Sequence, residues 1–313
     1  MSLSIILQQM GVICILVSIG ILLQKKGVVD DLTSKKLSAI VVDVCNPALI
    51  MASILGGNIT AGRRDLIYAA GLGVAFYAFL VVIGMFLPRL LHASPDNRKF
   101  YNLMCVYTNT GFLGIPIAKA ILPANAIIYV IVINIFYSLL FYTHGLAVLD
   151  HGTSNSGKKE GSSLKQIINP GIIMECLSLL VFWFSIKLPP ILENTVIYVG
   201  NATIFLSMVL LGVSIARSRF TDSLKDWRIW VFIALRLVLL PILVVLILHS
   251  VSFDKTATLA MCLMAAVPVG NLPMIQAEKK GMDTTILSSA IAVTTVVSIV
   301  TITILIAVAT AVL

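Results

Sequence analysis

The chain has 313 residues, of which 59% are hydrophobic and 12% are charged, and its mean hydropathy is +1.03. This composition excludes a water-soluble globular domain, which carries about 25% charged residues. The formal charge of +8 would suit a nucleic-acid partner, but the Lys and Arg residues lie in short connections between apolar stretches, where they fix membrane orientation. The composition therefore predicts a polytopic membrane protein with no nucleic-acid partner.

Ten apolar stretches are long enough to cross a bilayer, which takes about 20 residues per helix. They cover residues 4–23, 37–56, 66–87, 100–122, 126–147, 168–187, 193–215, 228–249, 256–277 and 284–311. The first lacks a basic start and a cleavage site, so we expect a retained helix. A Ser-, Gly- and Lys-rich linker at residues 150–166 separates five spans in residues 1–149 from five in residues 167–313.

The positive residues predict the orientation of these spans. Sixteen of the 22 Lys and Arg residues fall in the connections after the odd-numbered spans, and five fall at those after the even-numbered spans. Because positive residues collect on the cytoplasmic side, the odd connections, including the linker 150–166, are expected in the cytoplasm. Both termini are then outside, and the protein is expected in the cytoplasmic membrane.

The two halves of the chain repeat each other. MCVYTNTGFLGIPIAKA, residues 104–120, aligns without gaps with MCLMAAVPVGNLPMIQA, residues 261–277, and a weaker match joins the segments that begin at Asn46 and Asn201. Since each half has an odd number of spans, the second half enters the membrane with the opposite orientation. The expected fold is an all-α membrane protein of ten transmembrane helices in two inverted five-helix repeats, a plan common among secondary transporters.

Spans four and nine, which match in this repeat, are both interrupted near their middle. The interrupting residues are Asn109, Thr110, Gly111, Gly114 and Pro116 in span four and Pro268, Gly270, Asn271 and Pro273 in span nine. Glycine and proline free backbone groups that lipid cannot satisfy. Paired broken helices place a substrate site near the midplane, so we expect the spans to cross at their breaks and to bind substrate there. Kinks or close-packing positions are the alternative.

Further polar residues stand near the breaks. Gln276 lies about one turn beyond Pro273, and Asn134 shares a face of span five with Tyr137. We expect Gln276 and Asn134 to contact substrate, with helix capping or an interhelical hydrogen bond as the alternative. Lys119 either counters a carboxylate or extends outward along the apolar surface.

The charged residues Arg236, Asp43 and Glu175 lie inside predicted spans, at similar depths from the same side of the membrane. A charge within the membrane faces the bundle interior or a cavity. Arg236 would attract an anion and either acid would carry a coupling proton, whereas the alternative is a structural ion pair. The five cysteines have no metal-ligand spacing, and no motif for catalysis or phosphate binding is present. We therefore expect no cofactor, no metal site and no enzymatic activity.

Three stretches resemble the auxin efflux carrier family, which includes prokaryotic organic-acid carriers and the plant PIN-FORMED auxin exporters. They are NTGFLGIPIAKAI at residues 109–121, the segment from INPGIIMECLSLLVF to LPPILENTVIYVGNATIFLSMVLLGVSIA at residues 168–216, and VPVGNLPMIQAEKKGMDTTILSSAIAVTT at residues 267–295. The family's crossover asparagine matches Asn109, and its two crossover prolines match Pro116 and Pro273.

This resemblance implies a fold similar to the bile acid:sodium symporters, with helices 1, 2, 6 and 7 as a scaffold and helices 3–5 and 8–10 as a mobile core that contains the crossed helices 4 and 9. It implies a secondary transporter that moves small organic anions, such as malate-like, malonate-like or auxin-like acids, by an elevator motion. An anion channel or a membrane receptor using the same cavity is the alternative. The coupling ion, a proton or sodium, and the oligomeric state, with a homodimer as one option, stay open.

Overall fold

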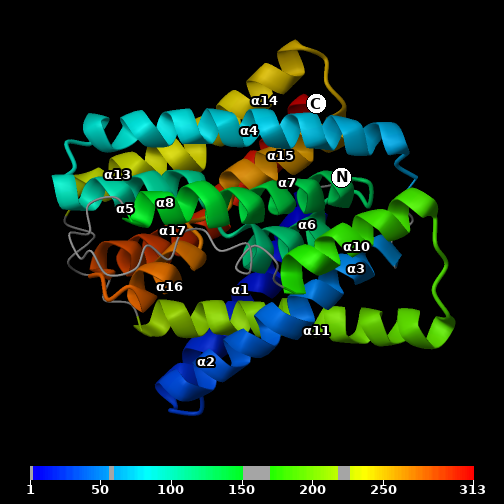
Figure 1. Ribbon diagram of the computed structural model, residues 1–313, viewed down its shortest axis with the longest axis horizontal. Helices are drawn as coiled ribbons and strands as arrows, with labels where there is room; N and C mark the ends of the chain where they lie inside the picture. The colour runs from blue at the N-terminus through cyan, green and yellow to red at the C-terminus, as the bar shows by residue number, and fades with distance from the viewer. Residues whose placement is uncertain (1–2, 56–59, 151–169, 218–225) are drawn as a thin grey trace.

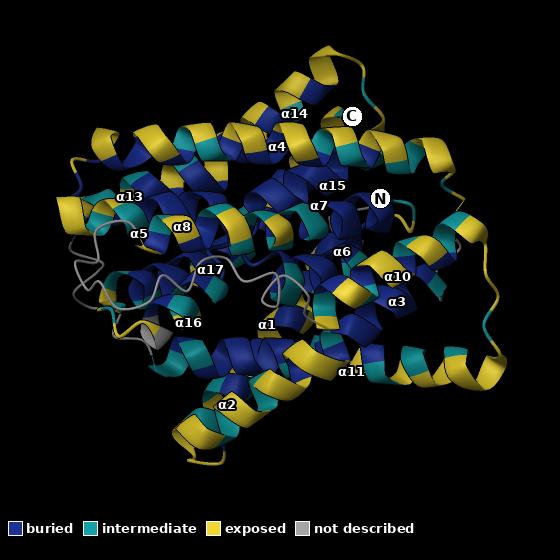
Figure 2. Cartoon of the chain, viewed as in Figure 1, coloured by how far each residue is buried: buried dark blue, intermediate teal, exposed yellow. Residues whose placement is uncertain are grey.

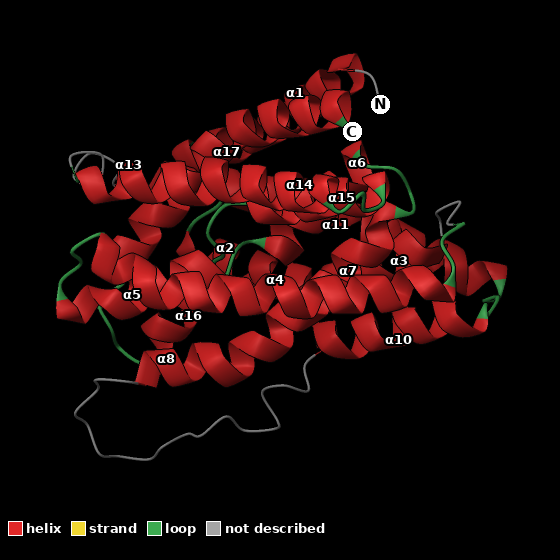
Figure 3. Cartoon of the chain, turned by 90° about the horizontal axis from the view of Figure 1, so that it is seen from above, coloured by secondary structure: helices red, strands yellow, loops and turns green. Residues whose placement is uncertain are grey.

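A computed structural model describes residues 3–55, 60–150, 170–217 and 226–313 of the chain. Within these ranges the protein is helical and contains no strand (Figure 3). Apart from Asp150, the predicted linker 150–166 lies outside the described residues.

Each predicted span corresponds to one helix or to a run of consecutive helical segments. In the first half these are α1 (Leu3–Lys25), α2 (Asp31–Ile40), η1 (Val41–Cys45), α3 (Asn46–Leu55), α4 (Arg63–Leu90), α5 (Pro95–Val106), η2 (Thr110–Gly114), α6 (Ile115–Ile121), α7 (Ala126–Leu140), η3 (Phe141–Gly145) and α8 (Leu146–Asp150). In the second half they are α10 (Pro170–Phe184), α11 (Pro190–Arg217), α13 (Trp227–Ile233), η4 (Ala234–Leu239), α14 (Leu240–Ser250), α15 (Lys255–Ala266), α16 (Leu272–Lys279) and α17 (Thr285–Val312). The η segments are single π-helical turns.

Seven helical segments within the described residues are long and apolar enough to cross a membrane. The three remaining predicted spans correspond to α10, which has 15 residues, and to the two broken segments. Large apolar side chains lie exposed on the outer helices, for example Ile67, Val74 and Phe86 on α4. Figure 2 shows exposed positions along the length of α4. Lipid is the solvent for such continuous apolar faces, and the chain is therefore a multi-pass membrane protein.

The helices pack most closely within two groups. The first group consists of α1, α3, α10 and α11, and the second of α4, α5, α7, α14, α15 and α17. Within the first group, glycines bring two backbones together, because a Cβ atom at Gly212 of α11 would overlap the Val17 carbonyl of α1. Figure 1 places α4 and α11 at opposite edges of the molecule, with α7, α15 and α6 between them. The groups meet where α7 contacts α3 and α10, and where α1 contacts α6 and α17.

The centre of the second group is α15, in which all ten residues from Ala257 to Ala266 are buried (Figure 2). It packs against α7, α14 and α17. Most of its side chains are small or flexible, since they are Ala, Thr, Cys, Met and Leu, and small side chains let membrane helices approach closely. The end of this buried helix is where the second predicted break begins.

Candidate functional site

The structure confirms that both predicted spans are interrupted. Helix α5 ends at Val106 and helical structure resumes at Thr110, while α15 ends at Ala266 and α16 begins at Leu272. The non-helical residues are therefore 107–109 and 267–271. The interruptions lie deep in the protein, because residues 100–110 and 257–270 are all buried.

The first break lies earlier than the glycine and proline pattern predicts. Gly111 and Gly114 belong to the π-helical turn η2, and Pro116 lies in the first turn of α6. Pro273 has the same place in α16. A helix does not need the N–H group of a residue in its first turn, so proline is compatible with a helix start there. Pro273 thus lies at the start of the second half-helix, whereas Pro116 follows the π-helical turn that begins at Thr110, and neither proline is among the non-helical residues of a break.

The two breaks are hydrogen-bonded to each other. The backbone N–H of Asn109 donates to the Pro268 carbonyl at 2.8 Å, and the N–H of Gly270 donates to the Tyr107 carbonyl at 3.0 Å. These bonds form one antiparallel bridge between residues 108 and 269. Because a Cβ atom at Gly270 would lie 2.8 Å from the Thr108 carbonyl oxygen, only glycine fits this approach. Each break therefore satisfies backbone groups of the other, as a site within a membrane requires.

Polar side chains form a chain that starts at the first break. Thr110 Oγ1 donates to Asn134 Oδ1 of α7 at 2.6 Å, and Asn134 Nδ2 donates to Glu175 Oε1 of α10. All three side chains are buried. The other carboxyl oxygen of Glu175, Oε2, is buried and has no hydrogen-bond partner among the described residues. This series of hydrogen-bonded side chains joins the first break to α10, which belongs to the first helix group.

The amide side chains beside the breaks differ in their surroundings. Asn109 is 4% exposed, and its side chain does not cap the turn that follows it, which removes capping as its role. Asn271 is partly buried, and its Oδ1 atom has no partner among the described residues. Gln276 is also partly buried. Amide groups that the protein leaves unpaired are available to a bound substrate.

Two asparagines that the sequence analysis did not include in the site, Asn46 and Asn201, lie against the helix that follows the first break. Asn46 Nδ2 stands 3.3 Å from the position that a Cβ atom of Gly111 would take, and its Oδ1 atom lacks a partner among the described residues. Lys119 Nζ donates to Asn201 Oδ1 of α11 at 3.0 Å. Asn46 and Asn201 are the residues at which the weaker internal match begins. That match was the signal in the sequence that could have drawn attention to them.

Arg236 holds the ends of both broken helices. Its side chain is 1% exposed and lies on the π-helical turn η4. Its Nε atom donates to the Cys105 carbonyl at 2.9 Å, and its Nη1 atom donates to the Ala265 carbonyl. Both carbonyls belong to the last turn of a half-helix, where they lack intrahelical partners and where the helix dipole favours a cation.

The ion pair of Arg236 with an acid, which was the alternative to an anion-attracting role, is not formed among the described residues. The ion pairs among the described residues join Arg217 with Asp31, Arg228 with Asp226, and Lys280 with Asp150. Asp43 lies exposed on η1. Similar depth in the membrane does not place two residues on the same side of a bundle, which explains why the depth argument was wrong.

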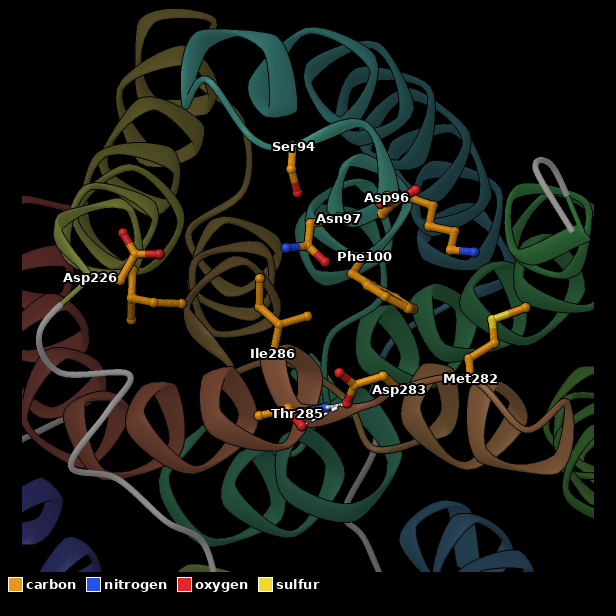
Figure 4. Close-up of a pocket in the computed structure, with 11 residues that line it drawn as sticks. Ser94, Asp96, Asn97, Phe100, Asp226, Met282, Asp283, Thr285 and Ile286 are labelled. Atoms are coloured by element: carbon orange, nitrogen blue, oxygen red, sulfur yellow. Dashed lines mark hydrogen bonds between the residues drawn. The ribbon is translucent and has the colours of Figure 1, made fainter.

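A cavity of about 690 Å³ lies apart from the breaks, and none of the predicted site residues lines it. Its lining includes Asp96, Asp226 and Asp283, near the first turns of α5, α13 and α17 (Figure 4). Asp283 accepts hydrogen bonds from Thr285 Oγ1 at 2.6 Å and from its backbone N–H at 2.9 Å. These bonds lower the pKa of Asp283. The carboxylate thus stabilises the start of α17.

An all-helical membrane protein in which two buried helix breaks are joined to each other has the architecture of a membrane transporter. The sequence comparison identifies the class more closely, because residues 5–306 match the model of the membrane transport protein family. The chain belongs to this family, which confirms the resemblance to the auxin efflux carriers. Membrane transport is therefore its function.

Two archaeal relatives match almost their whole length. An uncharacterized transporter of Methanothermobacter thermautotrophicus is 23% identical over 291 residues, which cover 92% of this chain and 93% of the relative. An uncharacterized transporter of Methanocaldococcus jannaschii is 21% identical over 300 residues, covering 92% and 94%. The chain is thus similar to these transporters from end to end.

Proposed function

We propose that the protein is a secondary active transporter of small organic anions and that the paired breaks are its substrate site. The observation that carries this proposal is the pair of hydrogen bonds between the breaks, at Asn109 with Pro268 and at Gly270 with Tyr107. Helical structure resumes at Thr110 after the first break and at Leu272 after the second. A helix N-terminus carries a partial positive charge and unpaired N–H groups, so two of them at one place favour a carboxylate.

The proposed site uses polar side chains for recognition and glycine and proline for shape. Its members are Asn109, Thr110, Gly111, Gly114, Pro116, Asn134, Pro268, Gly270, Asn271, Pro273 and Gln276. Asn109, Thr110 and Asn271 are the proposed direct contacts, because amide groups donate to carboxylate oxygens, and so does a hydroxyl group whose proton is not used elsewhere. The substrate class, a mono- or dicarboxylate of malate-like, malonate-like or auxin-like kind, rests on the family resemblance and on the positive helix ends.

The proposal includes ten transmembrane helices in two inverted repeats, with broken helices four and nine crossing at the site. The gapless match of residues 104–120 with 261–277 supports the repeat, and the antiparallel bridge at the breaks supports the crossing. The distribution of Lys and Arg supports a place in the cytoplasmic membrane with both termini outside and the linker 150–166 inside. Protease protection of tags at each terminus, in spheroplasts and in inverted vesicles, tests that orientation.

The proposed mechanism is an elevator motion of one helix group against the other. The group α1, α3, α10 and α11 corresponds to predicted helices 1, 2, 6 and 7, the scaffold, and the other group to the mobile core. Among the described residues, side-chain hydrogen bonds between the groups run from Asn134 to Glu175, from Lys119 to Asn201 and from Arg63 to the Trp183 carbonyl. With few polar contacts between them, the groups can slide without a large enthalpic cost.

Counterflow in reconstituted vesicles tests the proposal. Vesicles are loaded with unlabelled acetate, lactate, malonate, malate or indole-3-acetate, and uptake of the same labelled acid is measured. A carrier accelerates uptake when its own substrate is inside, whereas a channel gives unitary currents without such acceleration, and a receptor gives neither. Absence of accelerated exchange for every acid of the panel contradicts the proposal.

Asn109→Ala is the decisive variant. A hydrogen bond to a charged group contributes about 1.5–3 kcal/mol, so exchange should fall by roughly ten- to hundredfold. Because the Asn109 side chain does not cap the helix, the melting temperature should stay close to that of the wild type. Asn194→Ala, the same change on the exposed start of α11, is the control. Exchange within twofold of the wild type in Asn109→Ala contradicts the assignment of this residue.

A further inference from the structure

Glu175 is a buried acid with too few hydrogen-bond partners for a carboxylate. It is 2% exposed, and the one hydrogen bond assigned to it among the described residues comes from Asn134 Nδ2. Its Oε2 atom is buried without a partner. An ionised carboxylate accepts several hydrogen bonds, and burying a charge without them is costly. The position therefore suits a carboxyl group that gains and loses a proton.

No cation compensates the charge of Glu175 within the described part of the chain. Elements α3, α7 and η1 pack against α10. Helix α3 carries no titratable side chain, η1 carries Asp43 and Cys45, and α7 carries Tyr129 and Tyr137. Tyr77 of α4 and Cys176 of α10 also interact with the Glu175 charge.

None of these groups is positive, and Arg236 donates to two backbone carbonyls at the helix breaks. A proton, which binds to the carboxyl group itself, can neutralise Glu175 without any further ligand.

The hydrogen-bond chain from Glu175 has a direction that protonation reverses. In the arrangement observed, Thr110 donates to Asn134, and Asn134 donates to Glu175, so the Thr110 hydroxyl proton is used inside the chain. A protonated Glu175 can donate to Asn134 Oδ1 once the amide group turns over. Asn134 Nδ2 then donates to Thr110 Oγ1. An amide group takes either orientation according to its network, so no covalent bond changes apart from the added proton.

The reversed chain frees the Thr110 hydroxyl proton at the first break. A free hydroxyl proton can donate to a carboxylate oxygen, whereas in the other arrangement Thr110 presents only lone pairs, which repel an anion. The state of Glu175 is thereby transmitted to the substrate site through Asn134, over two hydrogen bonds.

We propose that Glu175 is the proton-coupling residue and that the chain Thr110, Asn134 and Glu175 makes anion binding at the first break depend on its protonation. This inference rests on the proposed function of the paired breaks. It names the proton as the coupling ion, places it on Glu175 and not on the exposed Asp43, and makes Glu175 a positioning residue that acts through Asn134. One proton binds with each anion, so the site becomes neutral when it is loaded.

Infrared difference spectroscopy of the purified protein without substrate tests the first step. Changing the pH should produce a carbonyl band of a buried protonated carboxyl group, and Glu175→Gln should remove it. Glu193→Gln, the same change at a partly exposed acid of α11, should leave the band in place. A band that persists in Glu175→Gln, or a wild type with no such band, overturns the inference without any need for a known substrate.

Vesicles containing a pH-sensitive dye test the coupling with the same panel of acetate, lactate, malonate, malate and indole-3-acetate. In the wild type, counterflow should fall by about tenfold per pH unit above the midpoint, because one proton is required. Net uptake into vesicles without internal acid should acidify the lumen, because the proton that enters with each anion does not return. The side-chain amide of glutamine donates a hydrogen bond at every pH, as the carboxyl group of Glu175 does only when it is protonated. Glu175→Gln should therefore exchange the acid at a rate independent of pH and move no protons.

Thr110→Val keeps the side-chain shape and removes the hydroxyl group, so it should abolish exchange while the infrared band of Glu175 remains. Thr110→Ser should restore exchange, and these two variants serve if Glu175→Gln does not fold. Net uptake by the wild type without proton movement, or proton movement that Asp43→Asn abolishes and Glu175→Gln does not, overturns the inference and leaves the proposed function standing. Failure of every acid to exchange in the wild type instead contradicts the proposed function itself.

Discussion

The role of Arg236 leads to a prediction about stability. Arg236→Leu keeps an apolar stem in the bundle and removes the donors that reach the carbonyls of Cys105 and Ala265. A buried acceptor that loses its donor costs about 1–3 kcal/mol, so two of them cost about 2–6 kcal/mol. Part of this loss is offset, because the variant no longer buries a charge whose Nη2 atom has no partner among the described residues. We expect a net loss in the lower half of that range.

Thermal unfolding in detergent without substrate measures this loss. A change of 1 kcal/mol moves the melting temperature by about 2–4 °C in domains of 150–250 residues, so Arg236→Leu should lower it by at least about 4 °C. Arg236→Lys keeps the charge with a single nitrogen atom and should be intermediate, since one ammonium group reaches the two carbonyls less well. Arg89→Gln is the control, because Arg89 is exposed and, among the described residues, donates to the Met85 carbonyl of its own helix.

The result that refutes this reasoning is a melting temperature of Arg236→Leu equal to that of Arg89→Gln, together with weaker anion binding. Arg236 would then act on the substrate and not on the half-helices. If Arg236→Lys were as unstable as Arg236→Leu, the planar geometry of the guanidinium would matter more than its charge.

Two further substitutions test the packing of the site. Gly270→Ala places a Cβ atom 2.8 Å from the Thr108 carbonyl oxygen, so it should lower stability by about 1–3 kcal/mol in thermal unfolding. Gly11→Ala is the control: a Cβ atom there has no atom within 4 Å, so this variant should be neutral or stabilising. Lys119→Met removes the hydrogen bond to Asn201 that joins the two helix groups. This variant should raise the exchange rate by up to about tenfold with little change in KM, because such a bond contributes about 0.5–1.5 kcal/mol. An unchanged exchange rate would contradict the role of the Lys119–Asn201 bond as a contact that is broken in each cycle.

The extent of the helices followed well from hydropathy, because the bilayer fixes the length of an apolar span. The predicted span 66–87 lies within α4, and the predicted span 228–249 lies within residues 227–250. The main error is at α2, which begins at Asp31 and not at residue 37. Asp30 caps this helix by accepting from the Thr33 N–H at 2.7 Å, and hydropathy cannot detect a polar turn that is held by a cap.

The partners within the site could not be predicted from the sequence. Spacing identified Asn134 and Arg236 as unusual, but their bonds reach Glu175, Cys105 and Ala265 across 41, 131 and 29 residues of sequence. Hydrophobic periodicity describes each helix alone and contains no information on which faces of distant helices meet. The internal repeat was the exception, because it identified the two breaks as a pair before their contact was known.

The two halves of the repeat contribute unequal chemistry to the site. In the gapless alignment, Asn109 and Thr110 match Ala266 and Val267, so the second break has no amide or hydroxyl at these positions. One backbone N–H group of the second break, that of Val269, finds its hydrogen-bond partner on another helix, because it donates to Thr294 Oγ1 of α17 at 3.3 Å. In the proposed mechanism, the first break therefore carries proton coupling and the contacts of Asn109 and Thr110, whereas the second supplies Asn271, its backbone and a positive helix end. Changes at Thr110 should then alter which acid is carried, while changes near the second break should alter how fast all acids are carried.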